Sequence, residues 1–171
     1  MKKITFFTAI AMIAFTSNAV AQATASGTAS SATVIAPIGI TNSATLLFGN
    51  LALTGAGTVV LYSDGTARAN TGGVTATSAG TNNPAAFDVT GEASFAYTVT
   101  LPGDTDVTLS DGATTSPSTM TVTGFESSHT ANGAIQTGGT DSFKVGATLN
   151  VGASQIAATY NGTFDVTVAY D

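Results

Sequence analysis

The sequence has 171 residues, with 4 Lys or Arg against 10 Asp or Glu, one His and no Cys. Its net charge of −6 argues against nucleic acid and anionic membrane surfaces as partners, because both are negatively charged. The absence of Cys excludes disulfide bonds, so stability has to come from burial and backbone pairing.

The first 21 residues have the three parts of a secretory signal peptide. Two lysines precede an apolar run at residues 4–15, which is too short to span a bilayer comfortably. Ala19 and Ala21 then fit the small residues of a cleavage site. We expect cleavage before Gln22, which leaves 171 − 21 = 150 residues and a net charge of 2 − 10 = −8. No later segment is long and apolar enough to cross a membrane, so the sequence predicts a secreted protein of one domain.

Residues 22–33 (QATASGTASSAT) consist almost entirely of small residues. In this segment Ala or Gly alternates with Ser or Thr: Ala23, Ala25, Gly27 and Ala29 with Thr24, Ser26, Thr28 and Ser30. Two interpretations stay open, a donor strand whose one face enters a narrow apolar groove, and a flexible leader. Fully extended, the segment reaches roughly 40 Å, enough to run along a neighbouring domain. Cleavage before Thr24 is the alternative start of the mature chain.

Residues 34–171 contain a series of short β-strand patterns, separated by turn residues at a spacing of about ten residues. The first pattern covers residues 34–40, where Pro37 restricts a strand to a sheet edge or a bulge. Ser63-Asp64-Gly65 and Asp111-Gly112 predict turns. Since no window after the predicted cleavage site has a sustained helical period, the pattern predicts one all-β domain, a sandwich or barrel.

The last twelve residues, YNGTFDVTVAYD, have the period of a half-buried strand. Phe164, Val166, Val168 and Tyr170 take every second position, so that one face of the strand is apolar. Asn161-Gly162 predicts a type I′ hairpin turn that pairs this strand with residues 155–160. Burial of the four side chains contributes at most about 6 to 12 kcal/mol, so we expect this strand to be integral to the core.

The residues with the chemistry of a site are few. His129 is the only histidine, and no strand-turn-helix context around it suggests a catalytic triad, so we expect a solvent-exposed loop residue. Asp104, Asp106 and Asp111 are clustered, but their spacing differs from that of a calcium-binding loop, so we interpret them as solvated carboxylates at turns and strand ends. The sequence predicts no catalytic residue, no cofactor, no metal and no enzymatic activity.

Lysine at the edge of a sheet is a common protection against pairing with another chain. The predicted mature chain has one lysine, Lys144. Its sheet edges are therefore either closed or covered by loops, or paired by a strand from another chain. A strand supplied by the next subunit is a head-to-tail contact that does not close, and it produces a filament.

Four segments in order, ATVIAPIGITNSATLLFGNLAL, LYSDGTAR, AAFDVTGEASFAYTVTLP and YNGTFDVTVAYD, resemble the secreted bacterial domain-of-unknown-function 4402 family over most of the mature chain. More loosely, the export signal, the alternating final strand and the penultimate Tyr170 are similar to pilins of the chaperone-usher class. That similarity implies a single antiparallel immunoglobulin-like β-sandwich that is incomplete and is completed by donor strand complementation. It also implies a periplasmic chaperone, an outer-membrane usher, and a location at the bacterial cell surface or in a fimbrium.

We therefore expect a non-enzymatic structural or adhesive surface protein, a subunit of a pilus-like fibre built from like subunits. Its contact with a neighbouring subunit or a chaperone would involve Phe164, Val166, Val168 and Tyr170. The alternative is a self-complete monomeric sandwich with a ligand- or matrix-binding role, whose own strand at residues 34–40 closes the sheet.

Overall fold

The computed structural model describes residues 23, 26–130 and 133–171. The predicted signal peptide and its cleavage residues Ala19, Ala21 and Gln22 lie outside this part of the chain. The chain divides into two compact units, Met1–Thr33 and Val34–Asp171. In the first unit, the described residues 23 and 26–33 are exposed and form no strand. Across the described residues, no helix has the length and apolar character needed to span a bilayer.

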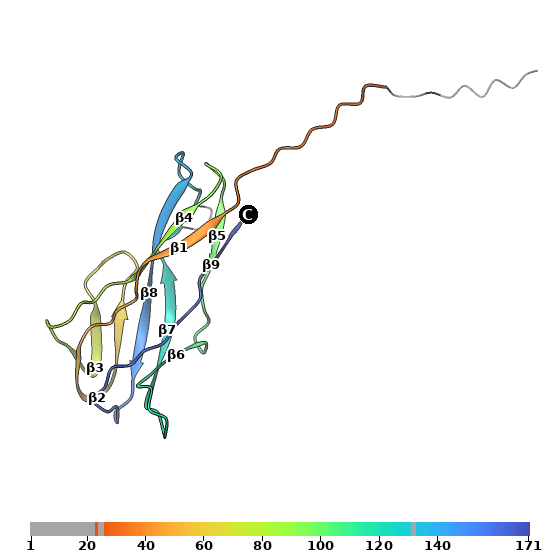
Figure 1. Cartoon of the computed structure of the whole chain (residues 1–171). Coiled ribbons are helices and arrows are strands. Elements are labelled where there is room, and N and C mark those ends of the chain that lie inside the picture. The colour runs from red at the N-terminus through yellow and green to blue at the C-terminus, as the bar shows by residue number, and fades with distance from the viewer. Residues whose placement is uncertain (1–22, 24–25, 131–132) are drawn as a thin grey trace, which may run out of the picture. The chain divides into compact units, whose positions relative to one another are not determined.

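The described residues of the second unit form nine antiparallel strands (Figure 1). They are β1 (Gly39–Ala44), β2 (Leu51–Leu61), β3 (Ala69–Ala76), β4 (Ala85–Thr90), β5 (Tyr97–Thr100), β6 (Val107–Ser110), β7 (Thr119–Ser127), β8 (Thr140–Val151) and β9 (Thr167–Tyr170).

Seven of these strands form one sheet around β8. On one side of β8, its first half pairs with β4 and its second half pairs with β2. On the other side it pairs with β7. β1 adds to β4, β3 to β2, and β6 to β7, while β5 and β9 form a separate two-stranded sheet. The prediction of an all-β antiparallel sandwich is confirmed.

Gly146 lies at the point where the partner of β8 changes. Val145 is in register with Ala85 of β4, and Ala147 is in register with Leu61 of β2. A Cβ at position 146 would overlap the carbonyl oxygen of Leu61. Glycine at this position therefore lets β8 pair with β4 along its first half and with β2 along its second half.

We expect Gly146→Ala to lower the free energy of unfolding by about 3 kcal/mol, because the added methyl has to push two backbones apart. Urea unfolding followed by circular dichroism measures this loss. Gly138→Ala is the matched control, since nothing lies within 4 Å of a Cβ there. A loss at Gly146 no larger than that at Gly138 would show that the approach of β2 does not require glycine.

The core has two clusters on the inner face of the main sheet. Val59, Val122 and Leu149 centre the first, between β2, β7 and β8. Phe87 and Phe143 lie in the second, with stacked rings whose centroids are 5.4 Å apart. None of the buried described residues is polar or charged. Hydrophobic burial and backbone pairing thus hold this fold together.

The alternation predicted for the last strand is confirmed. Phe164, Val166, Val168 and Tyr170 are half-buried, and the residues between them are exposed. Hydrogen-bonded pairing starts only at Thr167, however, where β9 runs beside β5.

The predicted hairpin at Asn161-Gly162 is wrong. Residues 155–160 form no strand, and Asn161 exchanges two backbone hydrogen bonds of 2.8 and 2.9 Å with Ser110 at the end of β6. A Cβ on Gly162 would lie 2.6 Å from the carbonyl oxygen of Thr108. Gly162 is therefore needed for close packing on β6 rather than for a turn with positive φ.

The strand predicted at residues 34–40 is also wrong in its bounds. β1 begins at Gly39, and Val34 is 95% exposed. The predicted turns are found, because Gly65 and Gly112 have φ angles of +83° and +75°. At the first turn the Asp64 carboxylate accepts a hydrogen bond of 2.8 Å from the backbone N–H of Thr66, and hydrogen bonding to Thr66 lowers the pKa of that carboxyl.

Candidate functional site

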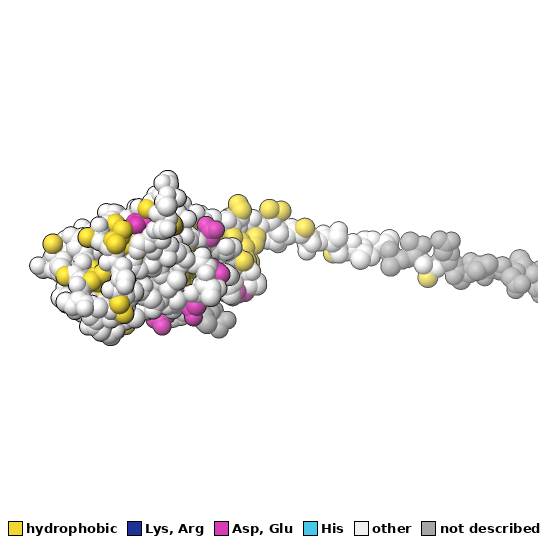
Figure 2. All heavy atoms as spheres, turned by 90° about the horizontal axis from the view of Figure 1, so that it is seen from below, with side chains coloured by type: hydrophobic (Ala, Val, Ile, Leu, Met, Phe, Trp, Pro, Cys, Tyr) yellow, Lys and Arg dark blue, Asp and Glu magenta, His cyan; other side chains and the backbone are white. Residues whose placement is uncertain are grey.

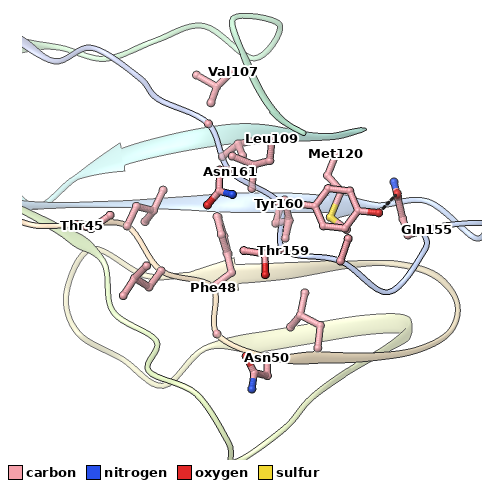
Figure 3. Close-up of a pocket in the computed structure, with 18 of the residues that line it drawn as sticks. Thr45, Phe48, Asn50, Val107, Leu109, Met120, Gln155, Thr159, Tyr160 and Asn161 are labelled. Carbon is pink, nitrogen blue, oxygen red and sulfur yellow. Dashed lines mark hydrogen bonds between the residues drawn. The ribbon is translucent and has the colours of Figure 1, made fainter. Parts of the chain in front are cut away.

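A cavity of about 780 Å³ opens beside the first core cluster (Figure 3). Its floor includes Val122 and Leu149, which are buried. Leu47 and Ile156 also line the cavity and are 39% and 57% exposed. Thr45, Asn50 and Thr159 are exposed lining residues too, so the cavity reaches the surface through a mouth of apolar and polar side chains. None of the described residues that line it is charged. Several polar side chains also line it, among them Asn50, Gln155 and Tyr160. The cavity therefore suits an uncharged occupant that has both apolar and hydrogen-bonding groups.

One wall of the cavity is the chain that leads into β2. Leu47 exchanges two backbone hydrogen bonds of 2.9 and 3.0 Å with Asn83, which fixes this wall from its outer side. The guanidinium of Arg68 donates hydrogen bonds to the carbonyl oxygens of Phe48 and Thr77. Arg68 thus holds the wall in place, a role that the sequence alone did not suggest.

The opposite wall is the chain between β8 and β9. Figure 3 shows the ring of Tyr160 in the cavity with its hydroxyl directed at Gln155. This hydroxyl lies 2.9 Å from Ser118 Oγ, 3.0 Å from Gln155 Oε1 and 3.0 Å from the Ile156 carbonyl oxygen. Gln155 Nε2 also donates to the carbonyl oxygen of Thr119 at 2.6 Å. These polar contacts close one end of the cavity.

Residues 162–166 of this wall are extended but unpaired. Within the described chain, no backbone hydrogen bond joins them to another segment. Their side chains still alternate in burial, as in β9 directly after them. Among the described strands, β9 directly after this stretch pairs only with β5, and of the stretch itself Gly162 and Phe164 line the cavity. The stretch therefore presents unpaired backbone N–H and C=O groups beside the cavity.

Of the four residues predicted for subunit contact, Phe164 lines the cavity. Val166, Val168 and Tyr170 pack against the second core cluster instead. The predicted contact therefore contributes one side chain to the cavity and three to the core beside it. Sequence reasoning did not assign the first wall to a site, because its residues, TLLFGNL, have no period that would place their apolar side chains on one face.

His129 is not the exposed loop residue that we expected. It is half-buried, its ring centroid lies 4.1 Å from that of Tyr97, and its Nε2 lies 2.9 Å from the Tyr97 carbonyl oxygen. The Tyr97 hydroxyl donates to Asp141 at 2.9 Å. Burial, together with this hydrogen bond, raises the pKa of Tyr97 above its ordinary value. His129 thus packs against a core tyrosine.

The predicted turn carboxylates hold loops. Asp104 Oδ1 accepts from the backbone N–H of Gly124 at 2.7 Å, and Asp106 Oδ2 accepts from that of Gly103 at 2.8 Å. Asp111 Oδ1 accepts from Ala113 and Ser118. Among the described residues, no three His, Cys, Asp or Glu side chains are grouped as metal ligands.

The face drawn in Figure 2 carries scattered hydrophobic side chains and several acidic ones, while no Lys or Arg is visible on it. This face therefore offers no basic surface to a polyanion.

Comparison with known proteins adds one finding. No curated protein matches the chain, and no solved structure does. A family model matches residues 38–170, which are nearly all of the unit Val34–Asp171. By this match the chain belongs to the family described as Domain of unknown function (DUF4402).

Proposed function

We propose that the protein is a non-enzymatic structural or adhesive subunit of a bacterial surface fibre, and that its cavity receives a β-strand from the next subunit. One observation carries the proposal, the unpaired extended stretch at residues 162–166 beside an uncharged cavity whose floor is apolar. An added strand pairs with such an edge through its main chain and fills such a cavity with alternate side chains.

The sheet composition supports the same proposal. The main sheet has seven strands, whereas the sheet opposite has only β5 and β9. A third strand next to residues 162–166 would extend the smaller sheet over the first core cluster. Open edges of this kind are otherwise protected in soluble proteins.

The place where the chain enters the domain supports a head-to-tail contact. Ala36 is hydrogen-bonded to Tyr170 and Glu92, just before β1, and the cavity lining starts at Thr45, just after β1. The six residues of β1 separate these points by roughly 20 Å. A segment that filled the cavity of its own domain would have to reverse and retrace β1, whereas the cavity of the next subunit needs no reversal.

In this proposal the donor is the N-terminal arm, defined as residues 22–33, of a like subunit. Its described residues are exposed and form no strand. Export through the periplasm, a chaperone that covers the cavity before assembly, and an outer-membrane usher belong to the same proposal. An apolar surface that is left open needs such cover during export.

The test places a charge at the mouth of the cavity. We expect the double variant Leu47→Asp, Ile156→Asp to fold normally, because both side chains are partly exposed, and to lose assembly by more than about a hundredfold, because an occupant would bury the charges. Size-exclusion chromatography and electron microscopy of the mature protein measure assembly, and circular dichroism measures folding. Tyr62→Asp is the control, since Tyr62 is 36% exposed and does not line the cavity. Normal assembly of the double variant would overturn the proposal.

The second candidate function is a monomeric protein that binds an apolar small molecule. The cavity volume of about 780 Å³ favours it, because ligand pockets typically measure about 300–1,000 Å³. A wild-type protein that stays monomeric and binds a neutral apolar fluorescent dye, with loss of that binding in the same double variant, would support this function.

A further inference from the structure

Three segments that are far apart in the sequence meet at the hydroxyl of Tyr170. This hydroxyl accepts a hydrogen bond of 2.6 Å from the backbone N–H of Glu92 and donates one of 2.8 Å to the carbonyl oxygen of Ala36. The Glu92 carboxylate accepts from the backbone N–H of Ala36 at 2.9 Å. Both backbone groups of Ala36 are thus held, one by Tyr170 and the other by Glu92.

The surroundings of Tyr170 keep this contact in place. A Cβ on Gly91 would overlap the Tyr170 hydroxyl, so glycine makes room for it. The ring of Phe95 packs edge-on against Tyr170 at a centroid distance of 5.8 Å. Asp171 donates its backbone N–H to the carbonyl oxygen of Ala96 at 3.3 Å. The ring of Tyr170 and the backbone of Asp171 are therefore both held in place at the end of β9.

Side-chain packing does not explain why Tyr170 and Glu92 bind the backbone of Ala36. Ala36 precedes β1 and carries no side chain into the core, and it is exposed. Two polar side chains nonetheless hold its backbone, although exposed backbone can hydrogen-bond to water. What the contact fixes is the root of the N-terminal arm, residues 34–38.

We propose that Tyr170 and Glu92 form a mechanical clamp, which passes load on the N-terminal arm from Ala36 into β9 rather than through β1 into the main sheet. The existence of load rests on the proposed function, since only an arm held by a neighbouring subunit is pulled. The wall at residues 162–166 continues directly into β9. Force would thus run from the inserted strand to β9, through the Tyr170 hydroxyl to Ala36, and into the next arm.

The first test measures the clamp in the monomer. We expect Tyr170→Phe, which removes only the hydroxyl, to speed hydrogen exchange of the Ala36 amide at least about fivefold and to leave the amides of β8 unchanged. Tyr160→Phe is the matched control. It also removes a tyrosine hydroxyl that is hydrogen-bonded, but the partners of this hydroxyl are Ser118, Gln155 and Ile156 rather than the arm root. Glu92→Gln keeps an oxygen acceptor and should exchange like wild type at Ala36. Unchanged exchange at Ala36 in Tyr170→Phe would refute the clamp, whatever the protein's state of assembly.

The second test measures load. With handles on cysteines introduced by Ser26→Cys and Asp64→Cys, pulling on wild-type protein should show an early rupture at the arm root before the domain unfolds. Tyr170→Phe should lose this rupture and Tyr160→Phe should keep it. An identical rupture in Tyr170→Phe would show that the hydroxyl bears no load. If instead the clamp tests succeed while the mature protein never assembles, the proposed fibre function fails and the clamp stands.

Discussion

Mature chains that lack residues 22–33 should fold normally and remain monomers. The nine strands of the described chain lie between Gly39 and Tyr170, and residues 23 and 26–33 are exposed, so among the described residues the deletion removes no pairing and no core residue. It does remove the proposed donor, without which the cavity of the next subunit stays open. We expect oligomers and fibres to fall below detection in size-exclusion chromatography and electron microscopy, with an unchanged circular dichroism spectrum.

Two single substitutions separate a donor strand from a flexible leader. Ala29 lies on the small apolar face of the alternating arm, and Ser30 lies on the opposite face. An aspartate at position 29 would be buried in the neighbouring cavity without a partner, which costs several kcal/mol, or more than a hundredfold in assembly. We therefore expect Ala29→Asp to block assembly and Ser30→Asp to permit it. Equal behaviour of the two variants, or fibres of normal length from the deletion, would rule out this arm as the donor.

The period-two pattern predicted strands well where one face is buried and the other is exposed. In β4 the residues Ala85, Phe87 and Val89 are buried and alternate with less buried ones. The same rule succeeded for Phe164 to Tyr170. It placed the first strand too early, because at residues 34–40 it read apolar alternation as burial, although Val34 is almost fully exposed. The actual β1, GITNSA, is an edge strand with three exposed and three half-buried residues that do not alternate.

The cavity could not be predicted, because each of its walls depends on partners that are distant in the sequence. Asn161-Gly162 has the composition of a hairpin turn, yet its backbone pairs with Ser110. A local pattern cannot distinguish a glycine required for positive φ from one required for close packing. Similarly, Arg68 lies in a loop and gave no signal of its own, although it holds the first wall through the Phe48 carbonyl oxygen.

Removal of residues 164–171 should abolish folding. The deletion takes away β9, the only strand in the described part of the chain that pairs with β5. It also takes away four half-buried side chains, whose burial contributes about 1 kcal/mol or more each. Tyr97, which is fully buried opposite Tyr170, would then lose its strand partner. The combined loss approaches the total stability of a typical domain, about 5 to 15 kcal/mol, so we expect an insoluble or protease-sensitive product without a cooperative unfolding transition.

Substitution of Phe164 alone tests, in the full-length chain, how much this segment contributes to stability. Its ring centroid lies 5.1 Å from that of Phe125 and 6.5 Å from that of Phe87, so it contacts both core clusters as well as the cavity. We expect Phe164→Ala to lower the free energy of unfolding by about 3 kcal/mol, near the small end of the range for a buried phenylalanine, because the ring is only half-buried. Asp165→Ala is the control, since Asp165 is exposed, and it should change the free energy by less than about 0.5 kcal/mol. A cooperatively folded protein lacking residues 164–171 would contradict both expectations, because the main sheet would then be stable without the segment that forms one wall of the cavity.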